Sequence, residues 1–131
     1  MKYYHYLFVA TLALSANAHA LQPKIEIFEQ FDDLRMIAFI SADDINNSPE
    51  WNPDLTPPSL TVYNAIKAVK KFRKKPTAVQ EIEIRPVPGY EKHWHYLIKV
   101  SNDAMKSKHD IYIVLMDGKI IPATIEPEGY K

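Results

Sequence analysis

One segment of this sequence has helical periodicity, and the segments after it have strand periodicity. This order limits the fold classes that the chain can adopt. Thr56 or Ser59 can cap the start of the helical segment, and Pro76 ends it. Apolar residues recur between these points at close to helical spacing: Leu60, Tyr63, Ile66, Val69 and Phe72. The pattern predicts one amphipathic helix, with basic residues gathered at its carboxyl end, where the helix dipole favours them.

The remaining chain carries two kinds of strand pattern: alternation of apolar and polar residues, as in 24–27, and apolar runs of strand length, as in 35–40. Segments 24–27 and 35–40 predict two short strands before the helix. Segments 80–85, 93–100 and 111–116 predict a meander of antiparallel strands after it, with a turn and a short continuation up to residue 122.

The predicted helix needs an apolar surface to cover its own apolar residues. The face of the meander that carries Trp94, Tyr96 and Ile98, together with Ile82 and Ile84, can supply it. We therefore expect an α+β fold, in which one amphipathic helix packs on an antiparallel sheet of three to five strands.

The first twenty residues have the pattern of a secretory signal peptide. Lys2 gives the positive start, residues 7–14 give a short apolar core, and Ala18 and Ala20 are the small residues that a signal peptidase accepts. The apolar run is too short to span a bilayer comfortably. We expect cleavage after residues 1–20, one exported domain at residues 21–131, a periplasmic or secreted location, and no stable membrane anchor.

Composition narrows the function classes. The chain has no cysteine, which excludes disulfides, thiol nucleophiles and thiolate metal sites. Basic and acidic residues balance at 16 each, so we expect no nucleic-acid partner. The basic cluster at residues 70–75 fits a site for phosphate, a lipid headgroup or an acidic protein. It fits a solvated helix end better, because no aromatic residues are interleaved with it.

No arrangement of residues in the sequence indicates catalysis. Carboxylates are paired at residues 32–33, at residues 43–44, and at Glu81 and Glu83, but no pattern shows that any pair faces across a cleft. No serine lies in a Gly-x-Ser-x-Gly turn, and no glycine-rich phosphate loop is present. We expect a protein that is not an enzyme and has no cofactor, with a divergent hydrolase as the least favoured alternative.

Three histidines offer a metal-binding alternative. His93 and His95 are two residues apart on a predicted strand, so their rings share one side, and His109 begins the next strand. If the three imidazoles converged, they could hold zinc or copper. In the other interpretation, His93 and His95 lie partly exposed on the sheet face opposite the helix.

The candidate binding residues are Trp51, Asn52 and Tyr112. Segment 41–58 reads as a long ordered loop, because its tryptophan is expected to pack back on the core, and long loops are often functional. Tyr112 is a surface candidate because Ile111, Ile113 and Leu115 occupy the opposite face of its strand, yet Val114 and Met116 share its side. An apolar second face would need a partner, a dimer contact or cover by the loop.

A further group of segments is informative when the segments are taken together. They are Ile40-Ser41-Ala42, Ser48-Pro49-Glu50-Trp51-Asn52-Pro53, Pro57-Pro58-Ser59-Leu60, Trp94, Tyr96, Val114-Leu115-Met116-Asp117-Gly118 and Pro122. Together they resemble a group of small uncharacterised secreted bacterial proteins. The helix and the three strands after it are similar to the PepSY-type domain, whose last strand commonly ends in a hydrophobic-Asp-Gly turn. The resemblance implies a non-catalytic exported domain, with PepSY-type relatives suspected of inhibiting peptidases or modulating partner proteins, and it assigns no catalytic residue.

These patterns together predict an exported binding or inhibitory module that presents segment 41–58 and an open sheet face to a protein or peptide. Edge strands of such a sheet can pair with an extended peptide or with a second copy to form a homodimer. The alternative is a small periplasmic metal-binding protein that uses His93, His95 and His109.

Overall fold

A computed structural model describes residues 24–31, 34–105 and 107–126 of the chain. The predicted signal peptide and the carboxylate pair at residues 32–33 lie outside the described residues. The elements in chain order are β1 (Lys24–Phe31), β2 (Leu34–Ser41), α1 (Ala42–Asn47), α2 (Val62–Arg73), β3 (Val79–Val87), β4 (Tyr90–Ser101), β5 (His109–Leu115), β6 (Ile120–Pro122) and β7 (Thr124–Ile125).

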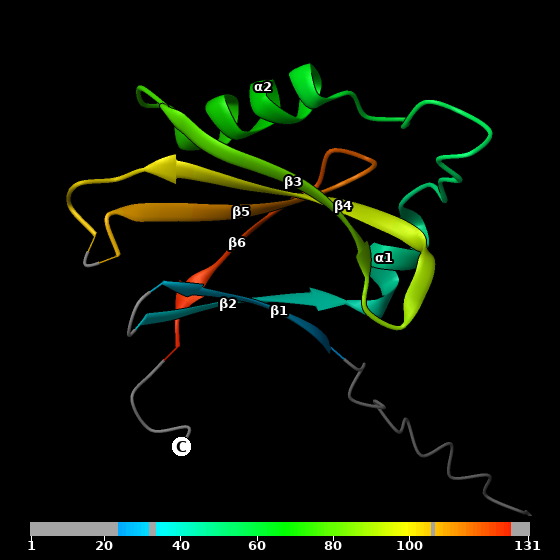
Figure 1. Cartoon of the computed structure of the whole chain (residues 1–131), viewed down its shortest axis with the longest axis horizontal. Helices are drawn as coiled ribbons and strands as arrows, with labels where there is room; N and C mark the ends of the chain where they lie inside the picture. The colour runs from blue at the N-terminus through cyan, green and yellow to red at the C-terminus, as the bar shows by residue number, and fades with distance from the viewer. Residues whose placement is uncertain (1–23, 32–33, 106, 127–131) are drawn as a thin grey trace, which may run out of the picture.

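The strands form two antiparallel sheets rather than one. The larger sheet has the order β3-β4-β5-β6, and the smaller has the order β1-β2-β7. Figure 1 shows three layers, with α2 on one face of the four-stranded sheet and the three-stranded sheet on the other. The α+β class is confirmed, but the expected single sheet is wrong. Alternation marks which face of a strand is buried and does not say which strand pairs with which.

The first core lies between α2 and the four-stranded sheet. Tyr96 and Ile98 are fully buried there, as predicted, whereas Ile84 is exposed. On the helix, Ala65 and Val69 are the buried residues. Their spacing of four positions places them on one helix face. The predicted stripe is therefore only partly correct: it includes Val69 but also Tyr63, which is mostly exposed.

The start of α2 lies later than the sequence indicated. Thr61 is the capping residue, and its side chain accepts a hydrogen bond from the Asn64 N–H at 3.1 Å. The Tyr96 hydroxyl donates to the Leu60 carbonyl at 2.5 Å, which holds the preceding chain against the sheet. At the other end, Lys74 adopts a left-handed conformation (φ 55°) and ends the helix two residues before Pro76.

The second core lies between the two sheets. Its fully buried members include Met36, Ile40, Leu97, Ile113 and Leu115. Strands β4 and β5 therefore bury both faces, one against α2 and the other against the three-stranded sheet. Near-continuous apolar sequence in a strand is typical of cover on both sides.

Segment 41–58 is not a loop throughout. Ser41 caps the six-residue helix α1 by accepting a hydrogen bond from the Asp44 N–H at 3.1 Å, and Ile45 is fully buried against the core between the sheets. Ser41 followed by acidic residues in the first turn is a helix-start signal. The prediction of a loop missed it because serine and aspartate are also common in turns.

Candidate binding surface

Trp51 packs against the core as predicted. Its ring lies edge to face against Trp94 with the centroids 5.1 Å apart. Its Nε1–H donates to the Thr56 carbonyl at 2.8 Å, and its backbone N–H donates to the Lys92 carbonyl at 2.9 Å. The only polar group of the side chain is therefore engaged inside the protein.

Asn52 lies beside Trp51 at the rim of an open hollow of about 590 Å³. Its side-chain oxygen accepts a hydrogen bond from the Asp54 N–H at 3.0 Å, which forms a local turn. Charged side chains, Glu50, Glu91 and Lys92, line the rest of the hollow. Trp51 and Asn52 thus stabilise the shape of this segment, and charged side chains form most of the lining of the hollow.

Tyr112 is not on an open surface. Its side chain is only 7% exposed and lies beneath α2, with its ring 5.8 Å from the ring of Phe72. Burial raises the pKa of Tyr112, and the nearby negative charge of Asp110 acts in the same direction. The expectation of a surface tyrosine is wrong because α2 covers the side of the strand that Val114 and Met116 share with it.

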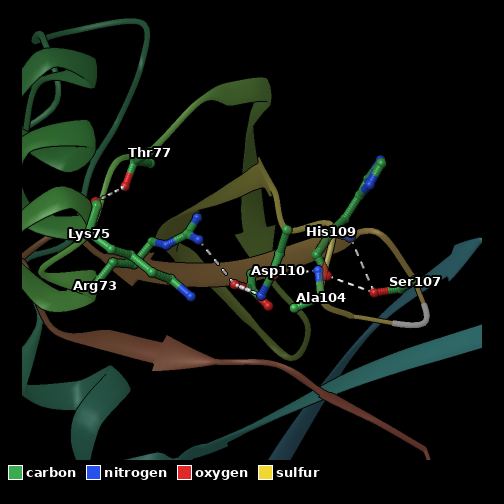
Figure 2. A network of polar contacts seen from close by, with 8 residues as sticks. Arg73, Lys75, Thr77, Ala104, Ser107, His109 and Asp110 are labelled. Carbon is green, nitrogen blue, oxygen red and sulfur yellow. Dashed lines mark hydrogen bonds and ion pairs between the residues drawn. The ribbon is translucent and has the colours of Figure 1, made fainter.

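The three histidines do not converge. His93 and His95 face away from α2 as predicted, but both are buried rather than partly exposed. His95 pairs with Leu115, whereas His109 pairs with Ser101, six positions further along β4. At the rise of a strand, this separation is about 20 Å. His109 lies at the start of β5 beside the β4–β5 loop (Figure 2), and the described residues contain no metal-binding group of three histidines or carboxylates.

The structure brings together a serine, a histidine and a glutamate that the sequence gave no reason to connect. Ser48 Oγ lies 3.3 Å from His93 Nδ1, and His93 Nε2 lies 4.0 Å from Glu50 Oε1. However, the buried Ser48 hydroxyl donates its proton to the Ile45 carbonyl at 2.6 Å. A serine nucleophile would have to give that proton to the histidine. In this structure the Ser48 proton is engaged by Ile45, and the cluster connects the end of α1 to β4.

The outer face of the three-stranded sheet, opposite the core between the sheets, carries apolar residues along a groove. The register places Phe28 opposite Ile37 and Glu26 opposite Phe39. Phe39 is 47% exposed, although it lies on the central strand of this sheet. A shallow groove of about 560 Å³ follows this outer face, lined mainly by Glu26, Phe28, Arg35, Ile37, Phe39 and Glu126.

Charged side chains border this groove. The Arg35 guanidinium stacks over the Phe28 ring at 3.5 Å and lies 3.5 Å from Glu126. Such stacking holds a cation over an aromatic face. Glu26 lies further along β1 and forms no ion pair with another described residue. The groove thus has an apolar floor, a paired arginine at one end and a free carboxylate at the other.

Strand β1 forms an edge of this sheet. Its partner is β2, and no other described strand pairs with it. Alternate backbone N–H and C=O groups of an edge strand point outward and can pair with another chain. The sequence carried one signal for this surface: residues 36–40 are continuously apolar, which predicts that both faces of β2 have apolar surroundings.

Comparison of the chain with protein-family models, with curated proteins and with solved structures gave no match. Neither α1 nor α2, the helices of the described residues, is long and apolar enough to cross a membrane.

Proposed function

We propose that this protein is an exported, non-catalytic module that binds an extended segment of a protein or peptide on the outer face of its three-stranded sheet. The observation that carries the proposal is the groove over Phe28, Ile37 and Phe39, beside the edge strand β1. Export rests on the signal-like residues 1–20.

Two kinds of contact support binding at this surface. An extended chain can add to β1 through backbone hydrogen bonds, and its alternate side chains can then lie over the groove. The groove supplies apolar contact for those side chains, since the Phe39 side chain in its lining is half exposed. Backbone pairing provides affinity, and side-chain contact provides selectivity.

The proposal includes a PepSY-like unit within the fold. Helix α2 precedes the antiparallel strands β3, β4 and β5, and the last of these leads into the turn at Asp117-Gly118. This order fits the helix and three strands that the resemblance implies. The three-stranded sheet on the other face is an addition to that unit, and the proposed binding surface belongs to this addition.

The test is the retention of extended peptides by residues 21–131. A library of acetylated, amidated peptides with alternating apolar and polar residues serves as the probe. We expect Phe39→Ser to weaken binding about tenfold or more, because the contact with a large aromatic side chain is lost. Leu55→Ser is the matched control, since Leu55 is 78% exposed and lies in a different segment.

Methylation of the peptide backbone separates strand pairing from general adhesion. A peptide whose alternate amides are methylated on the edge-facing side cannot donate to β1, and we expect it not to bind. Equal retention by the protein and by Phe39→Ser, or retention of the methylated peptide, would contradict the proposed site.

A further inference from the structure

We infer that the preferred ligand carries an aromatic residue, a basic residue two positions later, and an acidic residue two positions after that. This inference rests on the proposed function and adds the side-chain chemistry of the ligand. It follows from the side chains that β1 presents beside its free edge.

The outer face of β1 carries Lys24, Glu26 and Phe28 in alternation, while Ile25 and Ile27 pack toward the core between the sheets. Lys24 and Glu26 are exposed. Neither forms an ion pair with another described residue. The face therefore offers a cation, an anion and an aromatic ring, each two residues from the next.

An added strand places its own side chains directly opposite these three. Side chains on directly opposite residues of an antiparallel pair are close enough to interact, and opposite charges and aromatic pairs are favourable. Every strand pair described in this protein is antiparallel. In that orientation the ligand meets Phe28 first, then Glu26, then Lys24, which gives the order aromatic, basic, acidic.

Arg35, at the other end of the groove, is less available to a ligand than Glu26 and Lys24. It already stacks on Phe28 and pairs with Glu126, so its charge is partly neutralised. The charge that remains available to a ligand lies at Glu26 and Lys24. A second copy of the chain matches only two of the three positions. An antiparallel β1–β1 pair centred on Ile25 would place Lys24 opposite Glu26 twice, but the position that should face Phe28 is residue 22, a glutamine rather than an aromatic residue.

The experiment compares two peptides of identical composition: one has the order aromatic, basic, acidic at alternate positions, and the other has the two charges exchanged. We expect the first to bind about fivefold more tightly, since two cross-strand pairs change from repulsive to attractive. The double variant Lys24→Glu/Glu26→Lys should reverse that preference. Both variant residues are exposed, so the fold is retained, which circular dichroism checks.

The outcomes separate this inference from the proposed function. If both peptides bind equally to the protein and to the double variant, the inferred order of charges in the ligand is overturned. The proposed binding of extended peptides would still be supported. If neither peptide binds and Phe39→Ser also has no effect on the library, the binding surface itself is overturned. Concentration-dependent dimerisation that is lost in Phe39→Ser would overturn the peptide ligand in favour of a second copy.

Discussion

At the level of single residues, His95 is a titratable side chain that the fold removes almost completely from water. It is 1% exposed, between the two sheets, and its Nδ1 has no hydrogen-bond partner among the described residues. Burial is the main reason that its pKa is lowered to about 4, and the positive charge of Arg85 acts in the same direction. The folded protein therefore holds His95 neutral.

This environment predicts a pH dependence of stability. In the unfolded chain His95 takes up a proton near its ordinary pKa of 6.5, while in the folded protein it does so only near 4. The free energy of unfolding should thus fall as the pH drops from about 6.5 toward 4, by about 3 kcal/mol in total. Urea unfolding at a series of pH values measures this change in the free energy of unfolding.

His95→Leu is the variant that isolates this contribution, because leucine fills the apolar site without a titratable group. The difference in stability between the protein and His95→Leu should change across this pH window. His109→Leu is the control, since it leaves His95 in place and should keep the dependence. A constant difference for His95→Leu between pH 6.5 and 4 would refute the assignment.

Arg73 is a second residue with an unusual environment. Its side chain is 3% exposed, and Nη2 lies 3.4 Å from Asp110 Oδ2. Figure 2 shows Arg73 directed toward Asp110. Nε and Nη1 have no hydrogen-bond partner among the described residues. Asp110 also accepts a hydrogen bond from Asn102 at 2.8 Å. One carboxylate therefore compensates most of a buried positive charge.

We predict that Asp110→Ala lowers the free energy of unfolding by about 3 kcal/mol, because it leaves the Arg73 charge buried without a partner. The double variant Arg73→Met/Asp110→Ala should recover most of that loss, since methionine fills the space without a charge. Asp103→Ala, at an exposed position between β4 and β5, is the control. Urea unfolding gives all three values, and a double variant no more stable than Asp110→Ala would argue against the pair.

At the scale of elements, segment 41–58 connects the two sheets to the helix layer. Helix α1 places Ile45 in the core between the sheets, and Trp51 packs at the edge of the core under α2. The Ser48–His93 contact at 3.3 Å lies between these two anchors. The segment therefore has a structural role that its loop-like composition does not reveal.

For this element we predict that Trp51→Ala lowers the free energy of unfolding by about 2 kcal/mol, less than for a fully buried tryptophan. The loss comes from the contact with Trp94 and the hydrogen bond to Thr56. Leu55→Ala should change stability by less than about 0.5 kcal/mol. Peptide binding at the outer face should persist in a folded Trp51→Ala protein. Loss of that binding would instead indicate that the ligand site lies in segment 41–58.

At the scale of the whole molecule, the four-stranded sheet is the middle of three layers. Its two faces are occupied by α2 and by the three-stranded sheet, so the only sheet face left open in the described residues belongs to β1, β2 and β7. The chain crosses between the sheets after β6, and β7 then pairs with β2 (Figure 1). The first and last strands described, β1 and β7, thus belong to the same sheet and lie on either side of β2.

The local features of the fold could be predicted from the sequence. The spacing from Tyr63 to Phe72 predicted α2, alternation predicted the strands, and the Asp117-Gly118 turn separates β5 from β6 as expected. The alternation of Tyr96 and Ile98 also identified the face that α2 covers. These features depend on residues close together in the chain, whose backbone preferences and side-chain periodicity act locally.

Tertiary packing sets which surfaces are buried and which remain open. It placed Tyr112 under a helix, His95 between two sheets and Phe39 on an outer face. Each outcome depends on pairing between segments far apart in the chain, such as Met36 with Ile125. Strand periodicity assigns two faces to every strand, but which face is covered is set by the elements that pack on it, and local sequence does not encode that choice.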